Sequence, residues 1–200
     1  MEVTLFAIGL ALAYLGGLVV LEVVRRTLKL SAERTRRVAH IYSGLCTILY
    51  FQLLPGPWFI SLVVVSFLGS VISQRFGLLT AIHDVSRKTY GEVFLPIGNF
   101  TTYFISQGDP TVFISSILVL TFADSFAGLI SDLAKAKKQT VAASLVFFIS
   151  AAVILTITSG LNLWLALLTA FIVTLIERYS PLGSDNFTIP VSTALLILLF

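Results

Sequence analysis

The sequence predicts an all-α, polytopic membrane protein, and three observations support that prediction. Hydrophobic residues make up 57% of the 200 residues and charged residues only 12%, whereas soluble domains carry about 25% charged residues. The apolar residues gather in runs close to the length of about 20 residues that crosses a bilayer as a helix. All 13 Lys and Arg residues lie in alternate connections between those runs. We therefore expect about eight transmembrane helices in a single domain, residues 1–200, with no room for a soluble module.

Six of the apolar runs are near the spanning length: residues 3–24, 38–54, 57–73, 112–130, 140–158 and 161–176. Two shorter runs cover residues 93–106 and 188–200. The first run is longer than the core of a signal peptide and is followed by no small-residue cleavage site, so we expect it to be retained as a span. Residues 74–91 are too polar to span, and we expect a cytoplasmic loop or an interfacial helix there.

The connections between the runs are of two kinds. Those at residues 54–57, 106–110 and 158–162 are short turns without a basic residue. The positive-inside rule makes the basic side cytoplasmic and places both termini on the non-cytoplasmic side. If residues 93–106 did not cross, the third basic cluster would lie opposite the first, so the charges favour eight spans. The basic connections hold Arg25, Arg26, Lys29, Arg34, Arg36, Arg37, Arg75, Arg87, Lys88, Lys135, Lys137, Lys138 and Arg178.

The stretch at residues 177–190 is a long polar break between two apolar runs, without a basic cluster or a tight turn. Pro181 and Gly183 cannot continue a helix, and Asp185 and Asn186 stand directly before the next run. Carboxylates beside hydrocarbon are costly unless they bind a cation or a polar substrate. A purely structural role, with Asp185 or Asn186 capping the next helix, is the alternative that this stretch leaves open.

Two further groups of polar residues lie inside apolar runs or at the start of one. Asp124 would lie about 12 Å deeper than the polar end of its run if that run is helical, and a carboxylate at such depth is a functional-site hypothesis. Arg36, His40 and Gly44 recur every four residues and so share one helix face. Arg36 and Arg37 suit interfacial anchors, whereas His40 needs a polar partner, either a ligand or a neighbouring helix.

Together these residues are suited to phosphoryl or nucleotidyl transfer. Carboxylate and amide oxygens favour Mg²⁺, and basic side chains neutralise and position phosphates. The lysines at residues 135–138 are either the topology signal alone or a clamp for nucleotide phosphates. The sequence has no P-loop, kinase Gly-rich loop or dinucleotide fingerprint, so a nucleotide site here would be of a different, membrane-embedded design. The oxygen-bearing residues are Asp124, Glu177, Asp185 and Asn186.

At these residues the sequence resembles the family of CTP-dependent polyprenol kinases, which includes dolichol kinase, phytol kinase and CTP-using diacylglycerol kinase and is related to phosphatidate cytidylyltransferases. The resemblance covers nearly the whole chain. RRVAHIYSG (36–44) is similar to the RK-x-x-H-x-x-x-G segment of the family, GEVFLPIG (91–98) to its Gly-aromatic-Pro stretch, and FADSFAG (122–128) to its D-A-x-A segment. LIERYSPLGSDNFTIP (175–190) is similar to its segment with Glu followed by D-N-x-x-x-P, the most specific of the four.

The resemblance implies a lipid-alcohol kinase that transfers the γ-phosphate of CTP, or of another nucleoside triphosphate, to a membrane-dissolved prenol. The alcohol would enter sideways from the bilayer to a Mg²⁺-dependent site that faces the cytoplasm. The implied metal ligands are Asp124, Asp185 and Glu177. The implied catalytic residues are Asp185, Asp124 and His40. The implied nucleotide-binding residues are Lys135, Lys137, Lys138, Arg36, Arg37 and Asn186.

The sequence departs from the family at KQTVAAS (138–144), where Ala142 and Ala143 stand in place of Glu and Gly. Two other functions stay open: a CDP-lipid-forming cytidylyltransferase, and a non-catalytic membrane protein or transporter with an ion-binding carboxylate site. We expect an integral protein of the cell membrane in a prokaryote, or of the ER or plastid membrane in a eukaryote. Its expected partners are CTP, the lipid alcohol and membrane lipids, with no nucleic acid; a homo-oligomer is compatible with the sequence.

Overall fold

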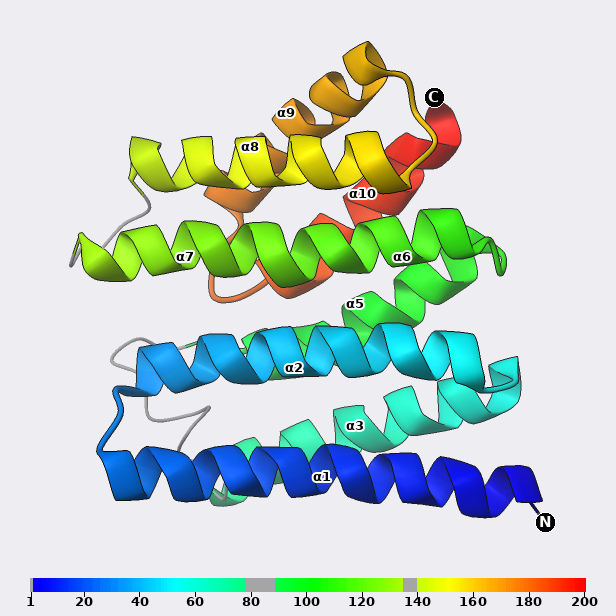
Figure 1. Ribbon diagram of the computed structural model, residues 1–200, viewed down its shortest axis with the longest axis vertical. Helices are drawn as coiled ribbons and strands as arrows, with labels where there is room; N and C mark the ends of the chain where they lie inside the picture. The colour runs from blue at the N-terminus through cyan, green and yellow to red at the C-terminus, as the bar shows by residue number, and fades with distance from the viewer. Residues whose placement is uncertain (1, 78–88, 135–139) are drawn as a thin grey trace. The chain divides into compact units, whose positions relative to one another are not determined.

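The computed structural model describes residues 2–77, 89–134 and 140–200, and within those ranges every regular element is a helix. The all-α prediction is confirmed for this part of the chain. The elements (Figure 1) are α1 (Glu2–Leu28), α2 (Ala32–Leu53), α3 (Gly56–Phe76), α5 (Gly91–Ser106), α6 (Pro110–Leu118), the π-helical turn η1 (Val119–Ala123), α7 (Asp124–Leu133), α8 (Val141–Thr158), α9 (Leu163–Tyr179) and α10 (Asp185–Leu199).

Each apolar run predicted from the sequence is helical. Because α6, η1 and α7 follow one another without a break, they form one long helix, Pro110–Leu133. Within the described ranges, four helices are long and apolar enough to cross a membrane: Glu2–Leu28, Gly56–Phe76, Pro110–Leu133 and Val141–Thr158. The apolar helix α10 is shorter. The chain is thus an integral membrane protein, while the count of eight spans and the side of the termini stay predictions.

Polar residues in the short turns start several of these helices. Asp109, Thr140 and Asn162 are the N-caps of α6, α8 and α9, and each side-chain oxygen accepts a backbone N–H two or three residues further on, at 2.7 to 3.1 Å. The first N–H groups of a helix have no partner within the helix, so these caps satisfy donors that would otherwise lack a partner in the protein.

The chain divides into two compact units, Met1–Lys88 and Thr89–Phe200, and each is described by itself. The single domain expected from the sequence stays a prediction. In the first unit, α1 contacts both α2 and α3. Tyr14 and Ser43 share a hydroxyl hydrogen bond of 3.0 Å between α1 and α2, and the hydroxyls of Tyr42 and Tyr50 donate to α1 carbonyls at 3.0 and 2.8 Å. Gly17 leaves room for the Tyr42 ring, which a Cβ at this position would overlap.

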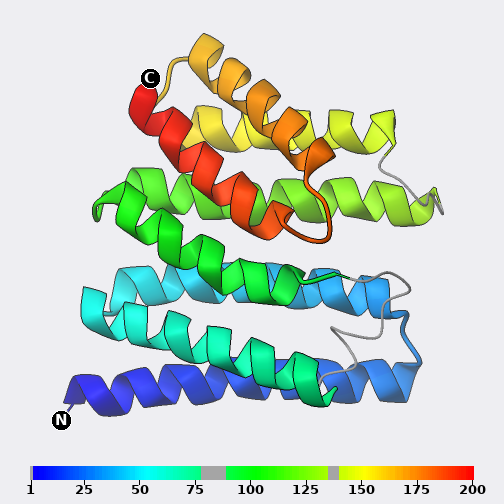
Figure 2. The same ribbon diagram turned by 180° about the vertical axis from the view of Figure 1, so that it is seen from behind.

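In the second unit, α8 and α9 contact each other, and both contribute small side chains to the hydrophobic core. Ala143 and Ala151 of α8 and Ala166 and Ala170 of α9 are all buried in the hydrophobic core. Small residues let helix backbones approach one another inside a membrane, where van der Waals packing replaces the hydrophobic driving force. The C-terminal helix α10 contacts α5, α6, η1 and α9, and Figure 2 shows α5 and α10 side by side.

Candidate functional site

The helices α5 and α10 begin next to each other in the second unit. The backbone N–H of Tyr90 donates to the carbonyl of Leu182 at 2.9 Å, and the side-chain Nδ2 of Asn186 donates to the carbonyl of Gly91 at 2.7 Å. From this junction the two helices run side by side (Figure 2). The positive ends of their helix dipoles therefore meet at one place.

Three glycines permit this close approach. A Cβ on Gly91 would lie 2.7 Å from Asn186 Nδ2. A Cβ on Gly98 would overlap the carbonyl oxygen of Asn186 and lie 3.0 Å from the Cα of Phe187. Gly183 has a φ of +84°, a backbone conformation that favours glycine, and a Cβ there would lie 2.7 Å from the backbone nitrogen of Gly91. Any larger residue at these positions would push the junction apart.

A buried proline lies inside each of these two helices. Pro96 in α5 and Pro190 in α10 have no N–H, so the carbonyls four residues earlier, those of Glu92 and Asn186, lose their usual helical donor. Such interrupted helices are tolerated within a membrane where protein covers the backbone or where it lines a polar cavity. The carbonyl of Asn186 lies against Gly98, so at this point packed protein covers the backbone.

Asp185 is the first residue of α10. The N-cap position belongs to Ser184, which makes no side-chain capping bond, and Asp185 Oδ1 accepts the backbone N–H of Asn186 at 3.0 Å. The alternative that Asp185 or Asn186 is the N-cap of this helix is therefore wrong, because Ser184 occupies that position. The carboxylate is half-buried and lies at the positive end of the helix dipole, which stabilises its negative charge.

Glu177 lies in the last turn of α9 and is buried. The turn after α9 brings this end of the helix to the start of α10, because the hydroxyls of Ser180 and Thr188 lie 2.7 Å apart and share a hydrogen bond. As the sequence predicted, the helix stops before Pro181 and Gly183. The structure thus places Glu177 and Asp185 on the two sides of one short turn.

Asp124 begins α7 directly after the five-residue π-helical turn η1. The sequence predicted a helix here but not the π turn, which no residue pattern in this short stretch signals. π turns are rare and are frequently found at functional sites. The half-buried Asp124 therefore lies at a local irregularity of the longest helix in the second unit.

The basic residues of the predicted site fall into three groups. Arg178 at the end of α9 donates from Nη1 to the hydroxyl of Ser144 in α8 at 2.9 Å. Ser144 ends the stretch in which the sequence departs from its family, so this bond ties that stretch to the turn beside Glu177. Arg36, Arg37 and His40 are half-buried on α2 in the first unit. Lys135, Lys137 and Lys138 lie outside the described residues. Most of the expected cytoplasmic loop or interfacial helix, residues 78–88, also lies outside them.

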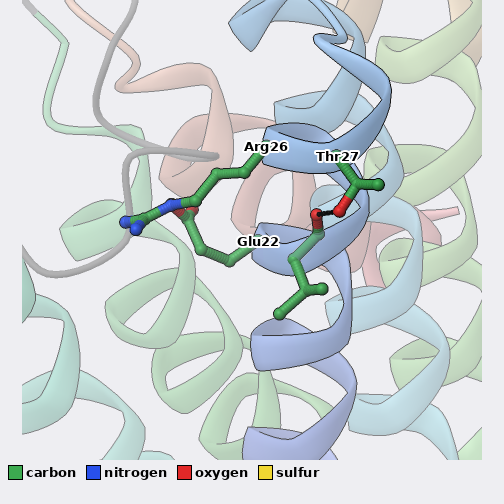
Figure 3. A network of polar contacts seen from close by, with 4 residues as sticks. Glu22, Arg26 and Thr27 are labelled. Atoms are coloured by element: carbon green, nitrogen blue, oxygen red, sulfur yellow. Dashed lines mark hydrogen bonds and ion pairs between the residues drawn. The ribbon is translucent and has the colours of Figure 1, made fainter.

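A buried carboxylate that the sequence analysis did not single out lies in the first unit. Glu22 in α1 is only 7% exposed, and its Oε1 accepts from Arg26 Nε at 2.6 Å (Figure 3). The Arg26 side chain is 65% exposed. The ion pair therefore joins a buried carboxylate to a guanidinium group at the protein surface. The sequence signal for this ion pair was an acidic residue four positions before a basic one. It was overlooked because the surrounding run is apolar.

The expected Mg²⁺ ligands are carboxylates, whose oxygens suit that ion. Across the described ranges, no group of three or more His, Cys, Asp or Glu side chains is arranged to hold a metal ion. Mg²⁺ at nucleotide sites is bound through one or two carboxylates together with substrate phosphates. The metal set of Asp124, Asp185 and Glu177 stays a prediction.

The fold and these residues define an integral membrane protein with carboxylates at the ends of its helices. No protein-family model matches the chain, and no solved structure matches it. It is similar to the phytol kinase of Synechocystis sp. (strain ATCC 27184 / PCC 6803 / Kazusa), with 31% identity over 209 aligned residues that cover 95% of this chain and 89% of the relative. The chain belongs to the polyprenol and phytol kinase family, and it is a kinase-like phosphotransferase.

Proposed function

We propose that this protein phosphorylates a membrane-dissolved prenol of the dolichol, polyprenol or phytol type, with CTP or another nucleoside triphosphate as donor. The observation that carries the proposal is the similarity to a phytol kinase over 95% of the chain. The segments that resemble the family, at residues 122–128 and 175–190, include the carboxylates Asp124, Glu177 and Asp185 at or near helix ends in the second unit.

The proposed reaction joins one substrate from water to one from lipid. The hydroxyl oxygen of the alcohol attacks the γ-phosphorus of the nucleotide, and a new O–P bond forms as the bond to the β–γ bridging oxygen breaks. The hydroxyl proton leaves to a carboxylate or to water. The products are the prenyl monophosphate, which stays in the bilayer, and the nucleoside diphosphate. Positioning and charge stabilisation supply most of the catalysis in such transfers.

Residues of the α5–α10 junction suit the positioning that this reaction needs. Asn186 fixes the start of α10 to Gly91 through its 2.7 Å hydrogen bond, and this places the neighbouring Asp185 at two converging helix N-termini. Helix N-termini attract phosphate groups. We propose that the nucleotide phosphates lie near this junction, with Asp124 and Asp185 as the two acidic residues nearest the transfer.

A Mg²⁺ ion held by Asp124 and Asp185, with Glu177 close by in sequence, would neutralise charge on the phosphates when bound. Basic side chains would add to this neutralisation. We assign Lys135, Lys137 and Lys138 to this role, while the roles that the resemblance implies for Arg36, Arg37 and His40 of the first unit stay predictions. The site would face the cytoplasm, since all these residues lie at or near the basic connections of the chain.

The experiment that tests the proposal uses purified protein, Mg²⁺ and CTP labelled at either the α- or the γ-phosphate. Phytol, a polyprenol, diacylglycerol and phosphatidate are offered separately. We expect the γ label to appear in the prenol and the α label to stay in the nucleotide. The α label in a lipid product would instead indicate a cytidylyltransferase, and no label in any lipid would favour a non-catalytic or transport function. Replacing CTP by ATP in the same assay tests the choice of donor.

A further inference from the structure

Two buried hydroxyls adjacent to Asp124 in sequence, like those of Thr102 and Thr169 elsewhere in the second unit, make no hydrogen bond to the residues that the structure describes. Most Ser and Thr side chains in these helices donate to the carbonyl one turn earlier, as Thr174 does to Ala170 at 2.7 Å and Thr193 to Ile189 at 2.7 Å. The hydroxyl oxygens of Thr121 and Ser125 are fully buried and have no hydrogen-bond partner among the described residues.

Leaving these hydroxyls without a partner is unfavourable. Thr121 is 0% and Ser125 3% exposed, so both side chains lie in the protein interior. Burying a hydroxyl without a hydrogen bond costs free energy, and in folded proteins such groups call for an explanation, commonly a ligand or an ordered water molecule. The same back-bond that satisfies Thr174 would be the simplest remedy, yet neither residue makes it.

Thr121 lies within the π-helical turn η1, and Ser125 lies one turn after it. A π turn inserts an extra residue into the helical repeat, and Asp124 follows it directly. This irregularity distinguishes Thr121 and Ser125 from Thr102 and Thr169, which lie in regular α-helices.

The arrangement of these groups matches a ligand that carries one hydroxyl group. Residues four apart lie on one helix face, so Thr121 and Ser125 point to the same side, with Asp124 between them in sequence. Leu120, Ala123 and Ala127 of the same helix are buried and apolar. A hydroxyl donates and accepts hydrogen bonds at once, and hydrocarbon favours an apolar wall. A ligand with one hydroxyl on a long hydrocarbon chain fits both requirements.

We propose that Thr121 and Ser125 bind the hydroxyl group of the lipid alcohol and hold it beside Asp124. This inference rests on the proposed function and specifies which residues position its lipid substrate. The two side chains donate to the alcohol oxygen, which leaves the alcohol proton directed toward a carboxylate acceptor. They are positioning residues for one substrate, and the nucleotide does not contact them.

The test uses the full-length protein in detergent, without nucleotide, and two conservative changes that remove only the hydroxyls, Thr121→Val and Ser125→Ala. Wild-type protein is heated with phytol or with phytane, the hydrocarbon of the same skeleton. A ligand that binds only the folded protein raises its melting temperature. We expect phytol to raise it more than phytane does, and the double variant to lose this difference. In the transfer assay we expect KM for phytol to rise about tenfold for each variant, with KM for the nucleotide unchanged.

Thr169→Val is the matched control. The Thr169 hydroxyl is also buried and has no partner among the residues that the structure describes, but it lies on α9, away from η1 in sequence. We expect this variant to keep the phytol response. The proposal is overturned if phytol and phytane act alike on wild-type protein, if the double variant keeps the difference, or if Thr169→Val loses it equally. Wild-type protein that binds phytol through these hydroxyls but transfers no phosphate to it would instead overturn the proposed function.

Discussion

The carboxylate of Asp185 combines several local features: it is half-buried, begins α10 and accepts the N–H of Asn186 at 3.0 Å. We predict that Asp185→Asn lowers kcat/KM by at least about 100-fold, because the change removes negative charge at the proposed site while keeping an oxygen acceptor of the same size. Initial rates of γ-phosphate transfer measure the loss, and the melting temperature checks that the protein stays folded.

Asp109→Asn serves as the control for that loss. Asp109 caps α6 in a turn without basic residues, and Asn is an N-cap as good as Asp, so transfer and melting temperature should both be unchanged. Full activity in Asp185→Asn would remove Asp185 from the proposed site.

Gly98 sets the distance between α5 and α10. We predict that Gly98→Ala destabilises the protein by about 1–3 kcal/mol, the usual range for overpacking, because the added Cβ would overlap the Asn186 carbonyl oxygen. Thermal unfolding in detergent measures the change. In Gly69→Ala, the control on α3, the new Cβ meets nothing within 4 Å, and Ala is the better helix former, so stability should be unchanged or higher. Equal effects at the two positions would contradict this account of the junction.

Single residues also show where sequence reasoning reached its limit. Pro181 and Gly183 were sufficient to predict the end of α9, because both act on the local backbone. The bond from Asn186 to Gly91 joins residues 95 positions apart, and no local pattern predicts such a pairing. The assignment of Asn186 to nucleotide binding stays a prediction, while the structure shows that its amide nitrogen already holds α5.

At the scale of elements, the apolar runs predicted the helices well because burial in lipid requires every backbone group to bond within its own segment. The boundaries were less well predicted: α2 begins at Ala32, six residues before the apolar run that predicted it. The π turn at Val119–Ala123 was missed, since a single irregular turn changes the hydrophobic pattern very little. Glu22 was missed because it is one acidic residue in a long apolar helix.

The contribution of the Glu22–Arg26 ion pair in α1 to the stability of the protein can be measured. We predict that Arg26→Gln destabilises the protein by about 1–2 kcal/mol, because a carboxylate with a 9% exposed side chain loses a cation at 2.6 Å. This value lies below the cost of breaking a fully buried pair because the arginine is 65% exposed and solvent screens it. Thermal unfolding of both single variants and the double variant measures the coupling.

Glu22→Gln is the matched partner in that cycle. It removes the buried charge, so the double variant Glu22→Gln, Arg26→Gln should be more stable than Arg26→Gln alone. Strictly additive effects of the two changes would mean that the ion pair contributes nothing to α1.

At the scale of the whole molecule, charge and hydropathy predict the class of protein to which the chain belongs. They do not predict which helices pack against one another. Composition predicted an integral membrane protein, and the helices agree. Arg36, Arg37 and His40 belong to the first compact unit, and Asp124 and Asp185 belong to the second. Their convergence in one site stays a prediction, because periodicity within one helix does not encode long-range packing. The transfer assay with variants from both units is its test.

The eight-span topology predicts on which side of the membrane individual residues lie. Eight spans place Gln107 and Tyr179 on opposite sides of the membrane, because three helical segments separate them, Pro110–Leu133, α8 and α9. If only the four helices with sufficient length and hydropathy crossed, two spans would separate these residues and both would lie on one side. In a Cys46→Ser background, which removes the only native cysteine, we expect a membrane-impermeant thiol reagent to modify Gln107→Cys in intact cells. Tyr179→Cys should react only after permeabilisation, because the positive-inside rule places the adjacent Arg178 in the cytoplasm. Modification of both in intact cells would contradict the eight-span topology and the cytoplasmic site with it.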